Sequence, residues 1–170
     1  VTPENLSVED RWILSEFAET MERVQNAWSN LDIYTATQSL KTFGTGILPS
    51  HWLEMSKSRL YDGNTNAAWT IHRIVRDLMS ALSPVCPFFT HHISSTLYST
   101  SAVDVREFPQ RTPGDSQLRK LTNSIEEFNG ATWRTKKKSG LSLNAPISGI
   151  SIPEELNEFT AILTQMHKLE

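Results

Sequence analysis

The sequence has one cysteine, Cys86, and no long run of apolar residues. A single cysteine cannot form a disulfide within the chain, which fits a reducing cytosol and predicts a cytoplasmic protein. A membrane-spanning helix needs about 18 consecutive, mostly apolar residues, so no membrane association is expected. No basic segment followed by an apolar one indicates a secretory signal. With 170 residues, 38% hydrophobic and 21% charged, the chain can form one or two small soluble domains.

The sequence also lacks an excess of positive charge. Its formal net charge is -3 at pH 7, so any contact with RNA must depend on a local basic surface. An initiator methionine is missing as well, because the chain begins at Val1 and ends on Leu169-Glu170, a pair that cloning sites often leave behind. We therefore expect an excised piece of a longer protein.

Apolar residues at spacings of three and four predict helices in the first part of the chain. The first helix begins after Ser7, where Ser7 and Asp10 occupy the positions of an N-cap and its partner. Its apolar positions are Ile13, Phe17, Met21, Val24, Trp28 and Leu31. A second helix from Tyr34 is interrupted between Gly44 and Pro49, where we expect a kink or a split because proline removes a backbone donor.

Turn and proline residues predict the next boundaries. Asp62-Gly63-Asn64 predicts a turn followed by a third helix with a ready cap. Pro84 and Pro87 end or bend that helix, and the segment "FFTHHISSTLYS" predicts a short fourth one.

A connector and a smaller second region follow. The connector contains Val103 and Val105, which suit a short strand, and Pro113-Gly114 is a natural boundary. A fifth helix is expected through Leu118, Leu121, Ile125 and Phe128. The segment "LSLNAPISGISI" alternates apolar and polar residues around a turn, as a small hairpin does, and a final helix is expected from Pro153.

These elements predict a mostly α fold. Residues 1–110 are expected to form an antiparallel helical bundle, and residues 111–170 a small helix-hairpin-helix appendage of α+β type.

One short segment resembles a catalytic motif. Glu54-Met55-Ser56-Lys57-Ser58 differs by one residue from the Lys-Met-Ser-Lys-Ser loop with which class I aminoacyl-tRNA synthetases hold ATP phosphates. Such a loop follows a strand of a parallel α/β domain and works with an upstream His-x-Gly-His, and this sequence predicts neither. Leu53 and Leu60 instead predict a helix here, whose backbone amides are already paired. The segment is therefore expected to be non-catalytic.

Other catalytic and metal-binding patterns are no stronger. His91 and His92 are adjacent, so on a helix they point about 100° apart, whereas metal ligands on a helix are three or four residues apart. Solvated or capping histidines are the simpler interpretation. Cys86 has no identifiable base and is expected to be a buried or partly buried structural thiol. No glycine-rich phosphate loop is present, so we expect no catalytic residue, no metal site and no bound cofactor.

Two clusters suit RNA binding. In an antiparallel bundle, the start of the first helix, the end of the second and the start of the third lie at one end, and this end carries Arg11, Trp12, Lys57, Arg59, Tyr61, Asn64 and Asn66. Basic, amide and aromatic groups together suit single-stranded RNA loops, although a solvated helix end is the simpler alternative. Arg134, Lys136, Lys137 and Lys138 close the fifth helix, where they suit either the helix dipole or a phosphate backbone.

The order of four segments resembles the anticodon-binding domain of the class I synthetases for valine, isoleucine and leucine. They are "DRWILS" at the first helix, "WLEMSKSRLY" at the end of the second, "LSPVCPFFTHHISSTLY", and Phe108-Pro109 where that family usually has Trp-Pro. The segment "WLEMSKSRLY" is similar to the valine enzymes, and the later "KKKSGLSLNAPI" resembles the segment that follows the bundle in the valine enzymes of archaea. His91 and His92 depart from the family, which usually has glutamates there.

The resemblance implies a non-catalytic fragment of a valine-specific tRNA ligase. Its expected partner is the anticodon arm of tRNA(Val), while N-terminal catalytic and editing domains of the same chain use ATP and Mg²⁺. The residues expected to bind tRNA are Arg11, Trp12, Lys57, Arg59, Tyr61, Asn64, Lys136 and Lys137. The alternatives are the same domain of an isoleucine or leucine enzyme, and a stand-alone helical protein-interaction module.

Overall fold

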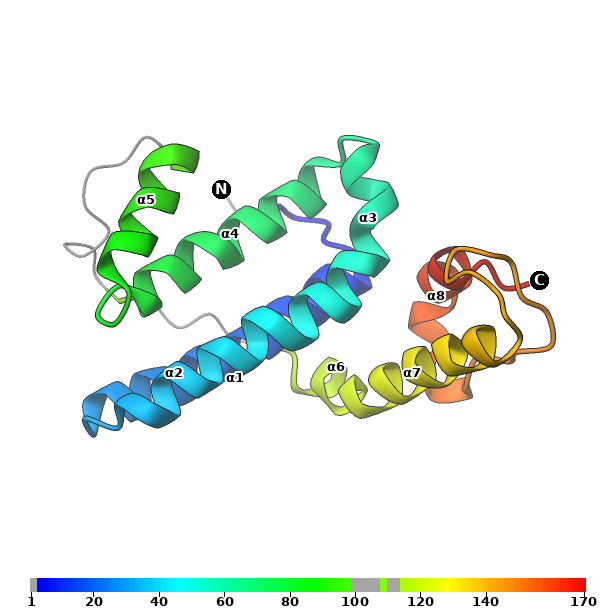
Figure 1. Cartoon of the computed structure of the whole chain (residues 1–170), viewed down its shortest axis with the longest axis horizontal. Coiled ribbons are helices and arrows are strands. Elements are labelled where there is room, and N and C mark those ends of the chain that lie inside the picture. The colour runs from blue at the N-terminus through cyan, green and yellow to red at the C-terminus, as the bar shows by residue number, and fades with distance from the viewer. Residues whose placement is uncertain (1–2, 99–107, 110–113) are drawn as a thin grey trace.

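The structure is a computed structural model that describes residues 3–98, 108–109 and 114–170. The helices of the first region are α1 (Val8–Ser29), α2 (Ile33–Thr42), the π-helix η1 (Phe43–Leu53), α3 (Glu54–Tyr61), α4 (Thr65–Leu82) and α5 (Pro87–Tyr98). Those of the second are α6 (Ser116–Lys120), α7 (Thr122–Lys138), the 3-10 helix η3 (Glu154–Phe159) and α8 (Thr160–His167). Helices dominate both regions (Figure 1), and the described residues contain no strand, so the predicted mostly α fold is confirmed.

A long hairpin of α1 and α2 forms the centre of the molecule (Figure 1). α1 buries the predicted apolar positions Ile13, Phe17, Met21 and Val24. The chain reverses at Leu31, which has a positive φ of 56°, and α2 starts at the N-cap Asp32, whose side chain accepts a hydrogen bond from the Thr35 amide at 2.9 Å. α4 packs across this hairpin, and α5 lies beside the C-terminal half of α4 (Figure 1).

The interruption predicted in the second helix takes the form of a π-helix. Phe43 and Glu54, at the two junctions of η1, both have helical backbone angles, so α2, η1 and α3 follow one another without a break. Pro49 lies inside η1. A wider helical turn relieves the clash of a proline ring with the preceding turn, which is a physical reason for π-helical geometry at this position.

The predicted cap at Asn64 and the predicted proline boundary agree with the structure. Asn64 is the N-cap of α4, and its side chain accepts a hydrogen bond from the Ala67 amide at 2.9 Å. α4 ends at Leu82 and α5 begins at Pro87, so the proline-containing segment separates two helices as expected.

Two predictions for the second region are wrong. The fifth helix is split into α6 and α7 at Leu121, and residues 141–152 do not form a hairpin. They pair with the C-terminus instead: the Ile147 amide donates to the Lys168 carbonyl, and the Glu170 amide donates to the Ile147 carbonyl, both at 3.0 Å. The suggested strand at Val103 and Val105 lies outside the described residues.

One hydrophobic core extends through both regions. Trp12 of α1, Leu118 of α6 and Phe159 of η3 are all buried in it, and the rings of Trp12 and Phe159 meet edge to face with centroids 6.3 Å apart. The division of the chain after residue 110 stays a prediction. No helix in the described residues is both long and apolar enough to cross a membrane.

Candidate functional site

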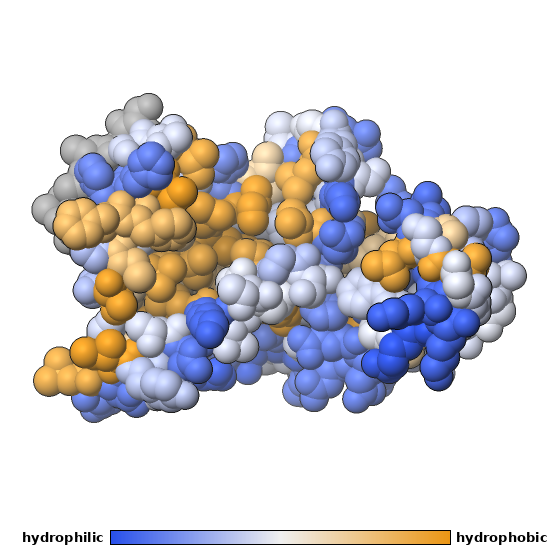
Figure 2. All heavy atoms as spheres, viewed as in Figure 1, coloured by the Kyte–Doolittle hydropathy of each residue, from blue (hydrophilic) through white to orange (hydrophobic). Residues whose placement is uncertain are grey.

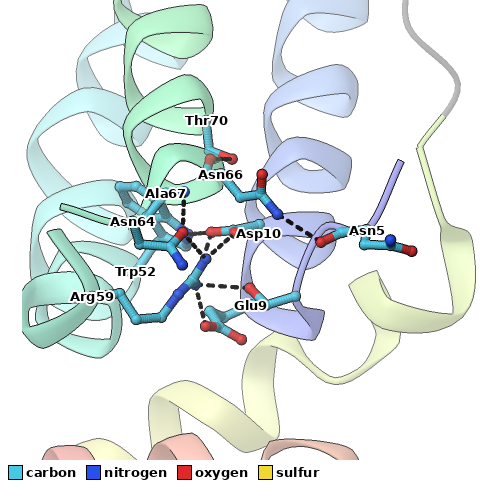
Figure 3. A network of polar contacts seen from close by, with 10 residues as sticks. Asn5, Glu9, Asp10, Trp52, Arg59, Asn64, Asn66, Ala67 and Thr70 are labelled. Atoms are coloured by element: carbon cyan, nitrogen blue, oxygen red, sulfur yellow. Dashed lines mark hydrogen bonds and ion pairs between the residues drawn. The ribbon is translucent and has the colours of Figure 1, made fainter. Parts of the chain in front are cut away.

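Three helix termini meet around the guanidinium of Arg59, as Figure 3 shows. Arg59, in the last turn of α3, donates to Ser7 Oγ at 2.8 Å and to Asp10 at 2.5 and 3.2 Å, and it forms an ion pair with Glu9. It also donates to Asn64 Oδ1 at the start of α4, at 3.3 Å. The prediction that the start of α1, the end of α3 and the start of α4 share one end of the bundle is therefore confirmed.

The carboxylates in this cluster are buried. Glu9 and Asp10 lie in the first turn of α1, where negative charge is favourable, and Arg59 lies in the last turn of α3, where positive charge is favourable. The Trp52 Nε1–H donates to Asp10 Oδ1 at 3.1 Å. Burial by itself lowers the pKa of Arg59, but the hydrogen bonds and charges of Asp10 and Glu9 outweigh burial and raise that pKa. The guanidinium is therefore a permanent cation that neutralises buried negative charge.

This geometry corrects the expected roles of Ser7 and Arg59. The Ser7 side chain does not cap α1; its oxygen accepts a hydrogen bond from Arg59. The Arg59 guanidinium was expected to face solvent or RNA, but it is turned inward, toward Asp10 and Glu9.

Burial also corrects two of the expected RNA contacts. Trp12 is completely buried, and its Nε1–H donates to Thr122 Oγ1 of α7 at 2.9 Å, so its ring has no free face for a base. Lys136 is also completely buried, and its ammonium donates to the carbonyls of His167 at 2.6 Å and Leu143 at 2.8 Å. Trp12 therefore holds the second region onto the bundle, and Lys136 holds the second region together.

The remaining expected residues are on the surface. The Tyr61 side chain is 81% exposed at the end of α3. Arg11 and Lys57 are exposed and lie near carboxylates on the surface, Arg11 at 3.6 Å from Glu158 and Lys57 at 3.4 Å from Glu54. Asn64 and Lys137 are exposed as well.

A second polar network connects η1 with α7 and α8. Asn129 Oδ1 lies 2.8 Å from His167 Nε2, and Asn129 Nδ2 lies 3.0 Å from His51 Nδ1. Since the amide oxygen accepts and the amide nitrogen donates, the proton of His167 is on Nε2 and that of His51 is on its Nε2, which faces Glu126 at 3.9 Å. His51 is therefore neutral in this arrangement, because its Nδ1 accepts a hydrogen bond.

Burial favours the neutral form of both histidines. Burial, together with the nearby ammonium of Lys136, lowers the pKa of His167 to about 4. Burial also lowers the pKa of His51, against the opposing charge of Glu126, and the pKa of Lys136. His167 Nδ1 is buried and has no hydrogen-bond partner among the described residues, so a proton there would be unpaired.

The structure also places the residues that were considered as catalytic or metal-binding candidates in the sequence. Residues 54–58 lie on α3, as predicted, with Met55 buried and Lys57 exposed. His91 and His92 are exposed on α5, and no group of three potential metal ligands occurs within the described ranges. Cys86 is exposed, so the expectation of a buried or partly buried thiol is wrong, because the turn between α4 and α5 leaves it on the surface.

Sequence reasoning missed the role of Glu9, Asp10 and Trp52 as partners of Arg59. The sequence did contain a signal for this pairing: the start of the first helix carries negative charge, the end of the second carries positive charge, and the two ends were expected to lie together. Asp10, Trp52 and Arg59 all belong to the segments that carry the family resemblance, and in the structure they form one hydrogen-bonded cluster.

Comparison with known proteins identifies the family. Residues 10–151 match the family model of the anticodon-binding domain of tRNA ligase. The match covers most of the chain, and the chain belongs to this family of anticodon-binding domains.

Valine–tRNA ligases are among the longer proteins that this chain resembles. The chain is 34% identical to the enzyme of Saccharolobus solfataricus over 149 residues, which cover 86% of this chain and 18% of the relative. It is 32% identical to that of Methanothrix thermoacetophila over 86% of this chain and 17% of the relative. It is 28% identical to the enzyme of Aeropyrum pernix over 94% of this chain and 21% of the relative. The chain thus spans about a fifth of the length of these curated relatives.

Proposed function

We propose that this chain binds the anticodon arm of tRNA(Val) as one part of a valine–tRNA ligase. In this proposal, N-terminal domains of the complete ligase use ATP and Mg²⁺ to join valine to tRNA(Val) and edit the product, and the chain described here positions the tRNA. The observation that carries the proposal is the family match over residues 10–151, together with valine–tRNA ligases as relatives.

The end of the bundle around α3 is the proposed RNA-binding surface. Tyr61 offers an exposed ring for stacking on an unpaired base, and Arg11, Lys57 and Asn64 offer charges and an amide at the same end of the bundle. The ion pairs of Arg11 and Lys57 are exposed and therefore weak, so a phosphate can replace the carboxylate partner at little cost. Arg59 acts indirectly, because it fixes the end of α3 against α1.

A second phosphate contact is proposed at the end of α7. Lys137 and Lys138 are exposed in its last turn, and Arg134 is exposed one turn earlier. Lys136 does not contribute its charge to this surface, because its buried ammonium binds backbone carbonyls. A favourable interaction of the lysines with the helix dipole is compatible with phosphate binding.

Filter binding of tRNA(Val) to single variants tests the surface. Tyr61→Ala is expected to weaken binding about fivefold to hundredfold, because stacking contributes about 1–3 kcal/mol per base. Lys57→Ala is expected to weaken binding and to reduce the slope of log affinity against log salt concentration by about 0.7–0.9, since one phosphate contact is lost. Lys41→Ala is the matched control: it removes the same charge from an exposed position in the last turn of α2, and neither quantity should change.

Two outcomes would contradict the proposal. Unchanged affinity of both Tyr61→Ala and Lys57→Ala would exclude the α3 end as the RNA-binding surface. Equal competition by tRNA(Ile) or tRNA(Leu) would remove the valine specificity and leave the more general assignment to a tRNA ligase.

A further inference from the structure

The polar network between η1, α7 and α8 lies on the inward side of α7. Hydrophilic residues also cover the surface around α7, as Figure 2 shows, but those face water. Asn129 and His167 are completely buried, and only 12% of the His51 side chain is exposed. The Trp133 ring packs against both imidazoles, with centroids 5.7 Å from each. His51 belongs to the bundle and the other three residues to the second region, so the network crosses the joint between them.

The Asn129 side chain limits the number of protons that the two rings can carry. Its oxygen lies 2.8 Å from His167 Nε2, and its nitrogen lies 3.0 Å from His51 Nδ1. The amide oxygen only accepts hydrogen bonds and the amide nitrogen only donates them. Whichever way the amide group is turned, one facing ring nitrogen must carry a proton and the other a lone pair. A charged imidazole has a proton on both nitrogens, so two charged histidines cannot both bind Asn129.

We propose that His51, Asn129 and His167 form an acid-sensitive latch between the bundle and the second region, which accepts one additional proton and opens when a second one binds. The first proton adds to His51 Nδ1. The Asn129 amide then turns over, so that its oxygen accepts from His51 and its nitrogen donates to His167 Nε2. His167 loses the proton on Nε2 and gains one on Nδ1, which leaves its charge at zero. This inference is independent of the proposed RNA binding.

The charges around the two rings determine which of them is protonated first. Glu126 of α7 lies 3.9 Å from His51 Nε2, and its charge favours a protonated His51. Lys136 of α7 instead lowers the pKa of His167. α3 also packs on α8, but among the described residues none of its charged side chains shifts either histidine pKa. The first proton therefore belongs on His51, and because burial lowers the pKa of this ring, it binds below pH 6.5.

The first proton already weakens the latch. It requires the proton of His167 to lie on Nδ1, which is buried and has no hydrogen-bond partner among the described residues. A buried donor without an acceptor is unfavourable. A second proton leaves two donors facing each other at Asn129, so the contact between η1 and the second region must break.

Nitrogen-15 NMR of the histidine rings tests the latch in the 170-residue chain. The ring shifts distinguish the charged form from each of the two neutral tautomers. At pH 7.5 both rings are expected to carry their proton on Nε2. As the pH falls, His51 should become charged, and His167 should move its proton to Nδ1 with the same midpoint while it stays neutral. Charged His167 should appear only when nuclear Overhauser contacts between the rings of His51 and Trp133 are lost.

Three results of this titration would overturn the proposal. The first is a His167 that keeps its Nε2 proton while His51 becomes charged. The second is a folded chain in which both rings are charged and the His51 ring still contacts Trp133. The third is a chain that unfolds before either ring is protonated.

Asn129→Asp should reverse the effect of acid on the latch. A carboxylate accepts from both rings, so both can be charged. In the parent chain, burial lowers both histidine pKa values, so their contribution to stability is complete above pH 6.5 and is lost as the pH falls. In the variant, the carboxylate should raise both pKa values, so the contribution is complete below pH 6.5 and is lost as the pH rises.

Thermal unfolding at pH 7.5 and pH 5.5 measures this reversal. Acid should raise the Tm of Asn129→Asp relative to the parent chain. Asn123→Asp is the matched control: it makes the same change at an exposed position of α7, and its Tm should respond to acid as the parent does. If the Tm of Asn129→Asp falls with acid as much as that of the parent, the latch is excluded. If the variant does not fold, the NMR titration of the parent chain decides.

Discussion

The guanidinium of Arg59 faces two carboxylates that are almost completely buried, those of Glu9 and Asp10. Charges removed from water cost several kcal/mol each unless they are paired with good geometry, and this one cation supplies the pairing. Arg59 thus ties the end of α3 to the start of α1.

Replacement of Arg59 is therefore expected to destabilise the fold strongly. Arg59→Met leaves two buried carboxylates without a cation, and the free energy of unfolding should fall by about 3–5 kcal/mol at pH 7. Urea unfolding measures this value. Lys57→Met is the control, because the ion pair of Lys57 is exposed and its loss should cost no more than about 1 kcal/mol. Equal losses for the two variants would contradict a structural role of Arg59.

His167 predicts an additional dependence of stability on pH. Its pKa falls from 6.5 to about 4 on folding, because the buried ring excludes the charged form. The unfolded chain therefore binds more protons between these values, and the stability that the neutral ring contributes is complete above pH 6.5 and is lost as the pH falls toward 4. Each pKa unit corresponds to about 1.4 kcal/mol, so the loss amounts to roughly 3 kcal/mol.

Urea unfolding at pH 7.5 and pH 4.5 measures this loss. The variant His167→Gln keeps an N–H donor for Asn129 but does not titrate, so its stability should depend less on pH than that of the parent chain by about 2–3 kcal/mol. The same pH dependence in both proteins would show that His167 is not the group responsible.

The sequence predicted which residues of the site are charged but not which are accessible. Tyr61 and Lys57 were placed correctly on the surface, because a helix end and its neighbouring turn are local features. The burial of Trp12 and Lys136 depends on partners far away in the sequence, Thr122 and His167. No local pattern in the sequence contains that information.

At the scale of elements, two glycines predict opposite effects of the same substitution. Gly46 lies inside η1, where an added Cβ would meet no atom within 4 Å and φ is not positive. Gly63 ends the turn after α3 with a φ of 72°, although the space around it is equally open. Gly46→Ala should raise the free energy of unfolding by about 0.5–1 kcal/mol, because alanine favours helical backbone.

Gly63→Ala is the matched counterpart. It should lower the free energy of unfolding by about 1 kcal/mol, since a left-handed conformation is unfavourable for a residue with a Cβ. Thermal unfolding measures both variants. A loss of stability in Gly46→Ala would show that the π-helix requires glycine for another reason.

Boundaries marked by local chemistry were predictable, and irregular elements were not. The cap at Asn64 and the prolines between α4 and α5 act on their immediate neighbours, so the sequence located them. The hairpin prediction for residues 141–152 was wrong because alternation of apolar residues does not determine which segment supplies the hydrogen bonds. The C-terminal Lys168 and Glu170 supply them here.

At the scale of the whole molecule, α7 is joined to α1 through Thr122. The Trp12 Nε1–H donates to Thr122 Oγ1, and the Thr122 hydroxyl donates to Glu16 at 2.6 Å. Burial raises the pKa of Glu16, and the hydrogen bond from Thr122 opposes this rise. The bond therefore stabilises the charged carboxylate at the joint between the two regions.

Thr122→Val is expected to weaken this joint. The substitution keeps the side-chain shape but leaves the Trp12 N–H without its acceptor, which should cost about 1–3 kcal/mol in the free energy of unfolding. Thr135→Val is the control, because Thr135 is exposed and its hydroxyl donates to the Ala131 carbonyl of the same helix. Because one core extends through both regions, tryptophan fluorescence and circular dichroism should report a single coincident transition. Two separate transitions would show that the regions fold independently.

The central claim is that this chain reads the anticodon arm of tRNA(Val), and one binding measurement tests it most directly. The affinity of the chain is measured for the isolated anticodon hairpin of tRNA(Val) and for the same hairpin with the anticodon of tRNA(Ile), at several salt concentrations. The account predicts tighter binding of the valine hairpin at every salt concentration, with affinity for both falling steeply as salt rises, because phosphate contacts release counterions. Equal affinity for the two hairpins, or affinity that does not respond to salt, would contradict it.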